Sequence, residues 1–268
     1  MSERSSYEPG EFCWVDLATT DIDAAVKFYG DLIGWEFEQA EPVDEAGGYG
    51  FFKYKGKQVA GAGPVQGEGQ PSAWSSYVNV LDADETAAAI KDAGGTVLID
   101  PFELPQESGR MAVCQDTEGA FFSILQLRKH SGAELVNEIG AWTWNQLATR
   151  DIESAKEFYG KVFGWTLEKA GGEAAADMPF FMWQVERQKF EEGLAGAMVM
   201  GEEMAGIPPH WQVYFCVEDA NAVIEKVNGS GGQTQFGPQR IPVGELAVFS
   251  DPQGASFAVI EPDYPEQR

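Results

Sequence analysis

Few side chains in this sequence have the chemistry of a catalytic or metal-binding site. The chain contains two histidines, His130 and His210, and three scattered cysteines that form no Cys-x-x-Cys pair. A transition-metal site needs about three imidazole, thiolate or carboxylate donors. Carboxylates are frequent, but among 43 acidic residues adjacency carries no information. The sequence has neither a Gly-x-Ser-x-Gly nucleophile motif nor a phosphate-binding loop, so it does not indicate those chemistries.

His210 is the histidine best placed for chemistry, because it starts a predicted strand beside Trp211. We expect it to make a structural hydrogen bond or to be solvated. A general base in a cleft and a ligand in a one-histidine metal site are the alternatives. His130 falls in a predicted linker between the two halves of the chain.

The elements that position the remaining candidate residues occur twice. Residues 14–35 align with residues 144–165 without a gap, and twelve of the aligned residues are identical: Trp, Leu, Ala, Thr, Asp, Ile, Ala, Phe, Tyr, Gly, Gly and Trp. Later segments also repeat, so that each half predicts the order β-α-β-β-β twice. A repeat on this scale decides the architecture before any other signal.

Each repeated unit has the start and stop signals of a strand followed by a helix. Asp21 suits an N-cap, the next residues are apolar at three-to-four spacing, and Gly34 suits the left-handed position that ends a helix. Gly61 and Gly63 in a later predicted strand suggest a bulge or a close backbone approach.

Composition limits the class of protein. With 268 residues and 44% hydrophobic content, the chain is long enough for about two domains with separate cores. Its formal charge of −25 disfavours nucleic acid and membrane partners. No stretch approaches the ~18 apolar residues of a membrane span. The first residues lack the order of a signal peptide, and the cysteines are expected to be reduced, so we expect a cytoplasmic protein.

The motif Phe-Tyr-Gly-x-x-x-Gly-Trp, followed near the end of each half by Asp-x-x-Gly-x-x-Phe, resembles the glyoxalase/bleomycin-resistance/extradiol-dioxygenase family, also called the vicinal oxygen chelate superfamily. The likeness covers nearly the whole chain as two fused copies. It implies an α+β protein with a tandem glyoxalase/bleomycin-resistance/dioxygenase fold, in which four βαβββ modules form two curved mixed sheets. The expected first domain is 11–128, the linker 129–140 and the second domain 141–262. Helices are expected on the convex side of each sheet and a ligand cleft on its concave side.

The same resemblance implies where a metal ion would be bound. Family members that use a metal carry two histidines and a glutamate at positions that correspond here, in the two halves, to Trp14 and Trp144, to Ser75 and Gln212, and to Ser123 and Ala258. None of these side chains is a metal ligand of the required kind. We therefore expect no bound metal ion and no cofactor.

Alternation along the strands predicts independently which residues face each cleft. Val78 and Val80 suit the helix side, so their neighbours face the cleft. The resulting set is Trp14, Asp16, Tyr77, Asn79 and Ser123 in the first half, and Trp144, Gln146, Gln212 and Tyr214 in the second. Asp16 could pair with a cationic ligand or act as a base of raised pKa. Its counterpart Gln146 has no charge, so the two clefts should differ in charge preference.

Aromatic walls with a few polar groups suit a small, flat or cationic organic molecule. The sequence thus predicts a protein that binds a small organic molecule without a metal ion, as a monomer or a homodimer. One alternative is a glyoxalase-like lyase or isomerase, or a hydroxylase or dioxygenase, with displaced metal ligands. Another is an interaction protein whose clefts are closed by Trp14 and Trp144.

Overall fold

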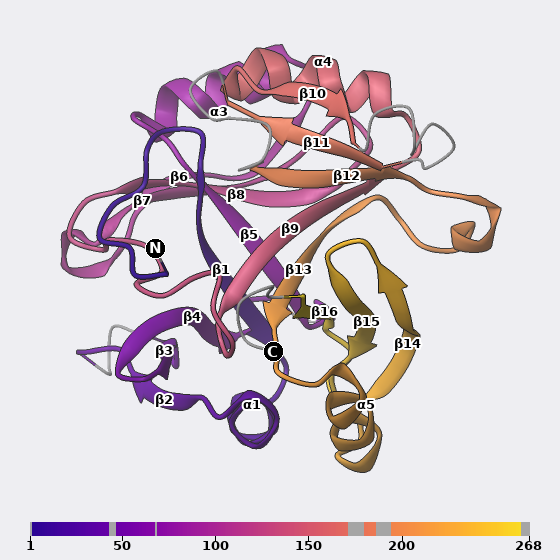
Figure 1. The fold of residues 1–268 in the computed structure, drawn as a ribbon. Coiled ribbons are helices and arrows are strands. Elements are labelled where there is room, and N and C mark those ends of the chain that lie inside the picture. Colours follow the sequence, from indigo (N-terminus) through magenta and orange to yellow (C-terminus); the bar gives the residue numbers. More distant parts are fainter. Residues whose placement is uncertain (1, 43–46, 68, 171–179, 186–193, 264–268) are drawn as a thin grey trace.

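The structure is a computed structural model that describes residues 2–42, 47–67, 69–170, 180–185 and 194–263 (Figure 1). The first half contains β1 (Phe12–Thr19), α1 (Ile22–Ile33), β2 (Glu36–Gln39), β3 (Gly50–Tyr54), β4 (Lys57–Pro64), β5 (Ala73–Asn79), α3 (Ala83–Asp92), β6 (Thr96–Glu103), β7 (Gly109–Gln115) and β8 (Phe121–Leu127). The second half contains β9 (Trp142–Thr149), α4 (Ile152–Phe163), β10 (Thr166–Lys169), β11 (Phe180–Gln184), β12 (Ala195–Val199), β13 (His210–Cys216), α5 (Ala220–Gly229), β14 (Gln233–Ile241), β15 (Gly244–Ser250) and β16 (Ser256–Pro262). None of the helices in the described ranges is long and apolar enough to cross a membrane.

The strands form two eight-stranded mixed sheets, one from each half. Their orders are β2-β3-β4-β1-β5-β8-β7-β6 and β10-β11-β12-β9-β13-β16-β15-β14. The two modules of a sheet meet through an antiparallel pair, β1 with β5 or β9 with β13. The predicted α+β fold of four βαβββ modules in two sheets is confirmed. We call the face of the first sheet around Trp14 and Tyr77 the first cup, and the face of the second sheet around Trp144 and Tyr214 the second cup.

The helices begin and end at residues with capping chemistry. Asp21 Oδ1 accepts a hydrogen bond from Ala24 N at 3.0 Å, which fixes the first turn of α1. Gly34 ends that helix with φ at 84°, a conformation in which most other residues would be strained. The apolar face of α1 is buried through Ala25, Phe28, Tyr29 and Leu32.

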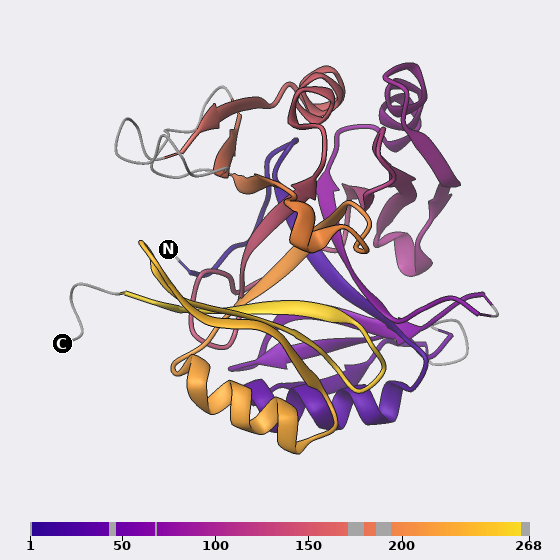
Figure 2. The same ribbon diagram turned by 90° about the vertical axis from the view of Figure 1, so that its right-hand side faces the viewer.

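The helix layer does not follow the division into halves. Helix α1 lies beside α5, and α3 lies beside α4, so each helix pair combines the two halves (Figures 1 and 2). Tyr29 of α1 donates a hydrogen bond to Asp251 Oδ2 at 3.1 Å and accepts one from Trp74 Nε1 at 2.9 Å. The matching contacts, at 3.0 and 2.8 Å, join Tyr159 to Asp116 and Trp211. Both cores therefore contain residues from both halves.

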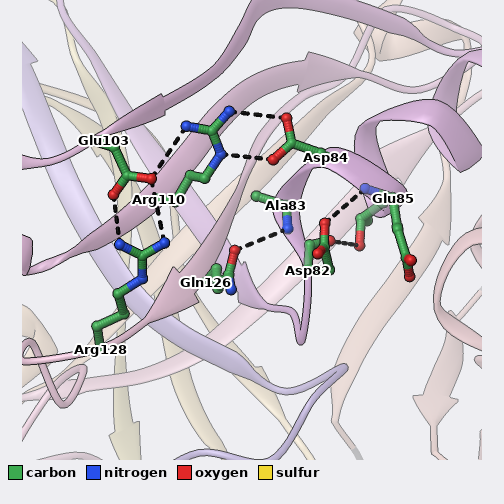
Figure 3. A network of polar contacts seen from close by, with 9 residues as sticks. Asp82, Ala83, Asp84, Glu85, Glu103, Arg110, Gln126 and Arg128 are labelled. Carbon is green, nitrogen blue, oxygen red and sulfur yellow. Dashed lines mark hydrogen bonds and ion pairs between the residues drawn. The ribbon is translucent and has the colours of Figure 1, made fainter.

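A network of ion pairs fixes α3 on the first sheet (Figure 3). Arg110 of β7 donates hydrogen bonds to both carboxylate oxygens of Asp84 in α3, at 2.7 and 2.9 Å. Glu103 of β6 accepts from Arg110 at 3.3 Å and from Arg128 at 2.7 and 3.2 Å. Because these groups are exposed to solvent, the pairs contribute little to stability. Their two-pronged geometry nevertheless orients α3 relative to β7.

The segment 129–140 packs against the first half. Its backbone donates hydrogen bonds to Cys13 O at 2.9 Å and to Gln58 O at 2.8 Å. The N-terminal segment runs beside it, because Arg4 N donates to Glu134 O at 3.0 Å. This packing brings His130 against the first cup.

Candidate functional site

A chain of hydrogen bonds runs through the first cup. Trp14 Nε1 donates to the Tyr49 hydroxyl at 3.1 Å, and that hydroxyl donates to Asp16 Oδ2 at 3.4 Å. The Tyr77 hydroxyl donates to the same oxygen at 2.8 Å. Three residues of the predicted set, Trp14, Asp16 and Tyr77, thus lie together. Tyr49, which joins two of them, was not in that set.

Tyr49 fits into the first cup because β4 carries no side chain beneath it. A Cβ atom on Gly61 would lie 1.9 Å from the Tyr49 oxygen, and one on Gly63 would lie 2.9 Å from its ring. The sequence predicted a bulge or a close backbone approach at these two glycines. The group that approaches them closely is the Tyr49 side chain.

His130 lies over Trp14 at the same site. The two ring centroids are 4.6 Å apart, with the planes nearly perpendicular, and the Phe51 ring is 5.9 Å from the imidazole. His130 Nδ1 accepts a hydrogen bond from Gly132 N at 2.9 Å. Burial lowers the pKa of His130 to about 4, so the ring is neutral at pH 7. Nothing in the sequence pattern indicated that a residue of the expected linker would contact Trp14.

The carboxylate of Asp16 is the charged group of the first cup, and its hydrogen-bond partners come from the same cup. Burial raises the pKa of Asp16 to about 6, and the hydrogen bonds from Tyr77 and Tyr49 oppose that rise. Burial, followed by the Asp16 charge, raises the pKa of both phenols well above 10, so both remain donors. In the first cup, Trp14, Tyr49 and Tyr77 are thus packed together, and the Asp16 carboxylate accepts from two phenols.

Three other predicted residues have different surroundings. Ser123 on β8 lies next to Tyr77 in the parallel register of the sheet. Asn79 Nδ2 donates to Tyr7 O at 2.8 Å and thereby holds the N-terminal segment. Gln212 Oε1 accepts from Ser256 Oγ at 3.0 Å. Both amide side chains are buried, and neither lines the cavity of the second cup.

The second cup contains an open cavity of about 540 Å³. The predicted residues Trp144, Gln146 and Tyr214 line it. Most of its remaining wall is apolar and includes Phe12, Val136, Trp142, Phe180, Met182, Leu194, Ile241, Val243, Leu246 and Ile260. The volume lies within the range of about 300–1,000 Å³ that is typical of small-molecule pockets in proteins.

Part of this cavity wall comes from the N-terminal segment. Arg4 and Glu11 line it and form an ion pair at 2.7 Å, so their charges cancel. The Arg4 guanidinium also lies 4.5 Å from the centroid of the Tyr7 ring. Sequence periodicity could not find these residues, because they precede β1 and reach the second cup only through the packing of the two halves.

The side chains at the two cups do not fit the metal centre that the resemblance implies. In the strand register, Trp14 faces Tyr77 and Tyr77 faces Ser123, and in the second cup Trp144 faces Tyr214 and Tyr214 faces Ala258. The expected positions Ser75 and Gln212 instead face Asp16 and Gln146, so the middle position of each set is held by a tyrosine. Across the described ranges, no group of three or more His, Cys, Asp or Glu side chains could hold a metal ion. His210 also lies outside any such group, and its Nδ1 is 2.9 Å from Pro208 O.

This fold, with a cup on each of two tandem sheets, defines the class of protein. The model of the Glyoxalase/Bleomycin resistance protein/Dioxygenase superfamily matches residues 12–124 and 139–259, and the chain belongs to this family.

Individual relatives are similar over the whole chain. The "Putative glyoxylase CFP32" of Mycobacterium tuberculosis is 39% identical over 267 residues, which is 98% of both chains. The "Anthracycline biosynthesis protein DauV" of Streptomyces sp. strain C5 is 32% identical over 271 residues, covering 95% of this chain and 94% of the relative. Among solved structures, the 2,3-dioxygenase LapB from Pseudomonas sp. KL28 superposes with a TM-score of 0.63 at 13% identity, covering 98% and 97% of the two chains. The Mn(II)-bound glyoxalase from Novosphingobium aromaticivorans superposes with a TM-score of 0.60 at 15% identity, covering 98% and 86%. These structures support the fold alone.

Proposed function

We propose that the protein binds a small, flat organic molecule in the cavity of the second cup and uses no metal ion to do so. The observation that carries the proposal is the contrast between the cups. The first is occupied by Tyr49, packed on Gly61 and Gly63, whereas the second keeps a cavity of about 540 Å³ beside Trp144 and Tyr214. Apolar walls with a few polar groups bind ligands through burial of their rings and orient them through the polar groups.

The name of one relative is consistent with an aromatic ligand. DauV is called an anthracycline biosynthesis protein, and anthracyclines contain fused flat rings. A fused-ring molecule of that kind suits the aromatic lining of the cavity. We propose this ligand class for the present chain without assigning a particular compound.

The test is a thermal-shift screen of fused-ring aromatic compounds, together with native mass spectrometry of the freshly purified protein. We expect a subset of compounds to raise Tm, because a ligand that binds only the folded state stabilises it. Leu246→Trp fills the cavity and should abolish the shift. The matched control is Met111→Trp, at the corresponding position of the first half, which should leave the shift intact. If no compound raises Tm and none co-purifies, an interaction protein without a ligand becomes the better account.

The glyoxylase name of CFP32 favours one second candidate, an enzyme of the glyoxalase type. Elemental analysis of protein purified without added metal separates the two proposals. About one Zn, Ni, Fe or Mn ion per chain would favour the enzyme. We expect substoichiometric metal, because the positions that would hold it carry indole, phenol, hydroxyl and methyl groups.

A further inference from the structure

The two cups are copies of one arrangement, and one of the differences between them is a single oxygen atom. In the first cup the Tyr49 hydroxyl accepts from Trp14 Nε1 and donates to Asp16 Oδ2, at 3.1 and 3.4 Å. This hydroxyl lies directly over Gly61, where a Cβ atom would be only 1.9 Å away. In the first cup, therefore, the space between the Trp14 indole N–H and the Asp16 carboxylate is occupied by the Tyr49 oxygen.

In the second cup the residue that corresponds to Tyr49 is Phe180. Gly50 pairs with Ala62 in the first sheet, and Phe181 pairs with the equivalent residue Ala197 in the second. Gly50 and Phe181 therefore correspond, and so do the residues that precede them, Tyr49 and Phe180. The Phe180 ring lies over Gly196, the counterpart of Gly61. A Cβ atom there would be 3.0 Å from that ring and 3.0 Å from Trp144 Nε1. The ring is retained in the second copy, and the oxygen is not.

The groups that would hold that oxygen are still present. Trp144 corresponds to Trp14 and Gln146 to Asp16, and both line the cavity. Within the described part of the chain, neither the Trp144 indole N–H nor the Gln146 amide makes a hydrogen bond. A donor and an acceptor therefore line one cavity, which lacks the atom that joins their counterparts in the first cup.

We propose that the cavity binds an uncharged aromatic molecule bearing a hydroxyl group, and that this hydroxyl takes the part played by the Tyr49 oxygen in the first cup. It accepts from Trp144 Nε1 and donates to Gln146 Oε1, while the ring lies against the apolar wall. Among the lining residues that the structure describes, the amide at position 146 is neutral and Arg4 and Glu11 pair with each other, so these residues leave no net charge to bind an ionic group. This inference rests on the proposed function, since it names the chemical class that the same cavity takes.

Two probes of similar shape test it. Titration calorimetry compares 2-naphthol, which has the hydroxyl, with 2-methylnaphthalene, which does not. We expect 2-naphthol to bind about three- to tenfold more tightly, the effect of one or two net hydrogen bonds. Trp144→Phe and Gln146→Leu should each remove most of this preference while leaving 2-methylnaphthalene binding within about twofold. Equal affinity for both probes in the wild type, or equal losses for both in the variants, would overturn the inference.

A reciprocal pair of variants supplies the control. Phe180→Tyr adds to the second cup the oxygen that the first cup already has, so the variant should lose its preference for 2-naphthol. Tyr49→Phe removes the oxygen from the first cup and should leave both affinities unchanged. A Phe180→Tyr protein that keeps the full preference would contradict the inference. Wild-type protein that binds neither probe nor any other aromatic compound would instead overturn the proposed function, and this inference with it.

Discussion

Asp16 is a carboxylic acid held between two phenols, and burial raises its pKa to about 6. The corresponding carboxyl in an unfolded chain ionises near pH 3.9. Between these two values the folded protein binds the additional proton. The contribution of Asp16 to stability therefore falls as the pH rises from about 4 to about 6, and it stays low above that range.

Replacing Asp16 by asparagine removes this pH dependence while keeping an oxygen that can accept from the Tyr77 hydroxyl. The change in the free energy of unfolding caused by Asp16→Asn should be more favourable at pH 8 than at pH 4 by about 2 kcal/mol. Urea unfolding at the two pH values measures the difference. Asp23→Asn, on the exposed face of α1, is the control and should show no such difference. An equal effect of Asp16→Asn at both pH values would contradict the burial of an unfavourable charge.

At the level of single residues, strand alternation predicts which side chains share a face of the sheet. Strand alternation led to Trp14, Asp16 and Tyr77, which do lie together. It could not lead to Tyr49, which precedes β3 and depends on a tertiary contact with β4. The only available signal was the spacing of Gly61 and Gly63, two small residues on one face of a strand. His130 had no signal, because its position depends on the packing of an irregular segment.

Strand β4 and its counterpart β12 differ in how closely an aromatic side chain packs on their glycines. Gly61→Ala would put a methyl group within 1.9 Å of the Tyr49 oxygen, so the Tyr49 side chain must move and its hydrogen bonds are lost. We expect a loss of about 2–3 kcal/mol in the free energy of unfolding. Gly196→Ala meets the Phe180 ring only at 3.0 Å and should cost about 1 kcal/mol or less.

Chemical denaturation of the two variants tests this ranking. Gly229→Ala in α5 has open space around it and is the control, which should be neutral or slightly stabilising. Equal costs for Gly61→Ala and Gly196→Ala would mean that Tyr49 is not packed on β4 as described.

Helices α1 and α4 each carry one tyrosine, Tyr29 or Tyr159, that makes a hydrogen bond to the opposite half of the chain. Tyr29→Phe would leave Asp251 Oδ2 and Trp74 Nε1 without their shared partner in a buried position. We expect this to lower the free energy of unfolding by about 1–3 kcal/mol, and Tyr159→Phe to have a similar effect. Thermal and urea unfolding measure both. Tyr54→Phe, at a partly exposed tyrosine of β3, should change stability by less than about 0.5 kcal/mol. If Tyr29→Phe changed stability as little as Tyr54→Phe, the hydrogen bonds that join Trp74, Tyr29 and Asp251 would add no net stability.

At the level of the whole molecule, the repeat predicted the four modules but not their pairing. Each module presents the same apolar helix face and the same strand pattern, so that a helix from either half can cover a given sheet. The sheets follow the halves, whereas the helix pairs α1–α5 and α3–α4 combine them. Because the choice depends on differences between nearly equivalent surfaces, hydrophobic periodicity alone cannot make it.

This arrangement predicts that neither half folds alone as a monomer. Isolated residues 1–140 would expose the faces that α5 and β13 cover, and would leave Tyr29 and Asp116 without the partners that residues 141–268 provide. We therefore expect each isolated half to be unfolded, aggregated or paired with a second copy, and the two halves produced together to form one stable complex. Size-exclusion chromatography and circular dichroism of the separate and combined halves measure this. The intact chain should unfold in a single cooperative transition, since both cores are shared. A half that is a folded monomer with its own cooperative transition would contradict the shared cores, and would mean that the cup with the cavity does not need the other half to form.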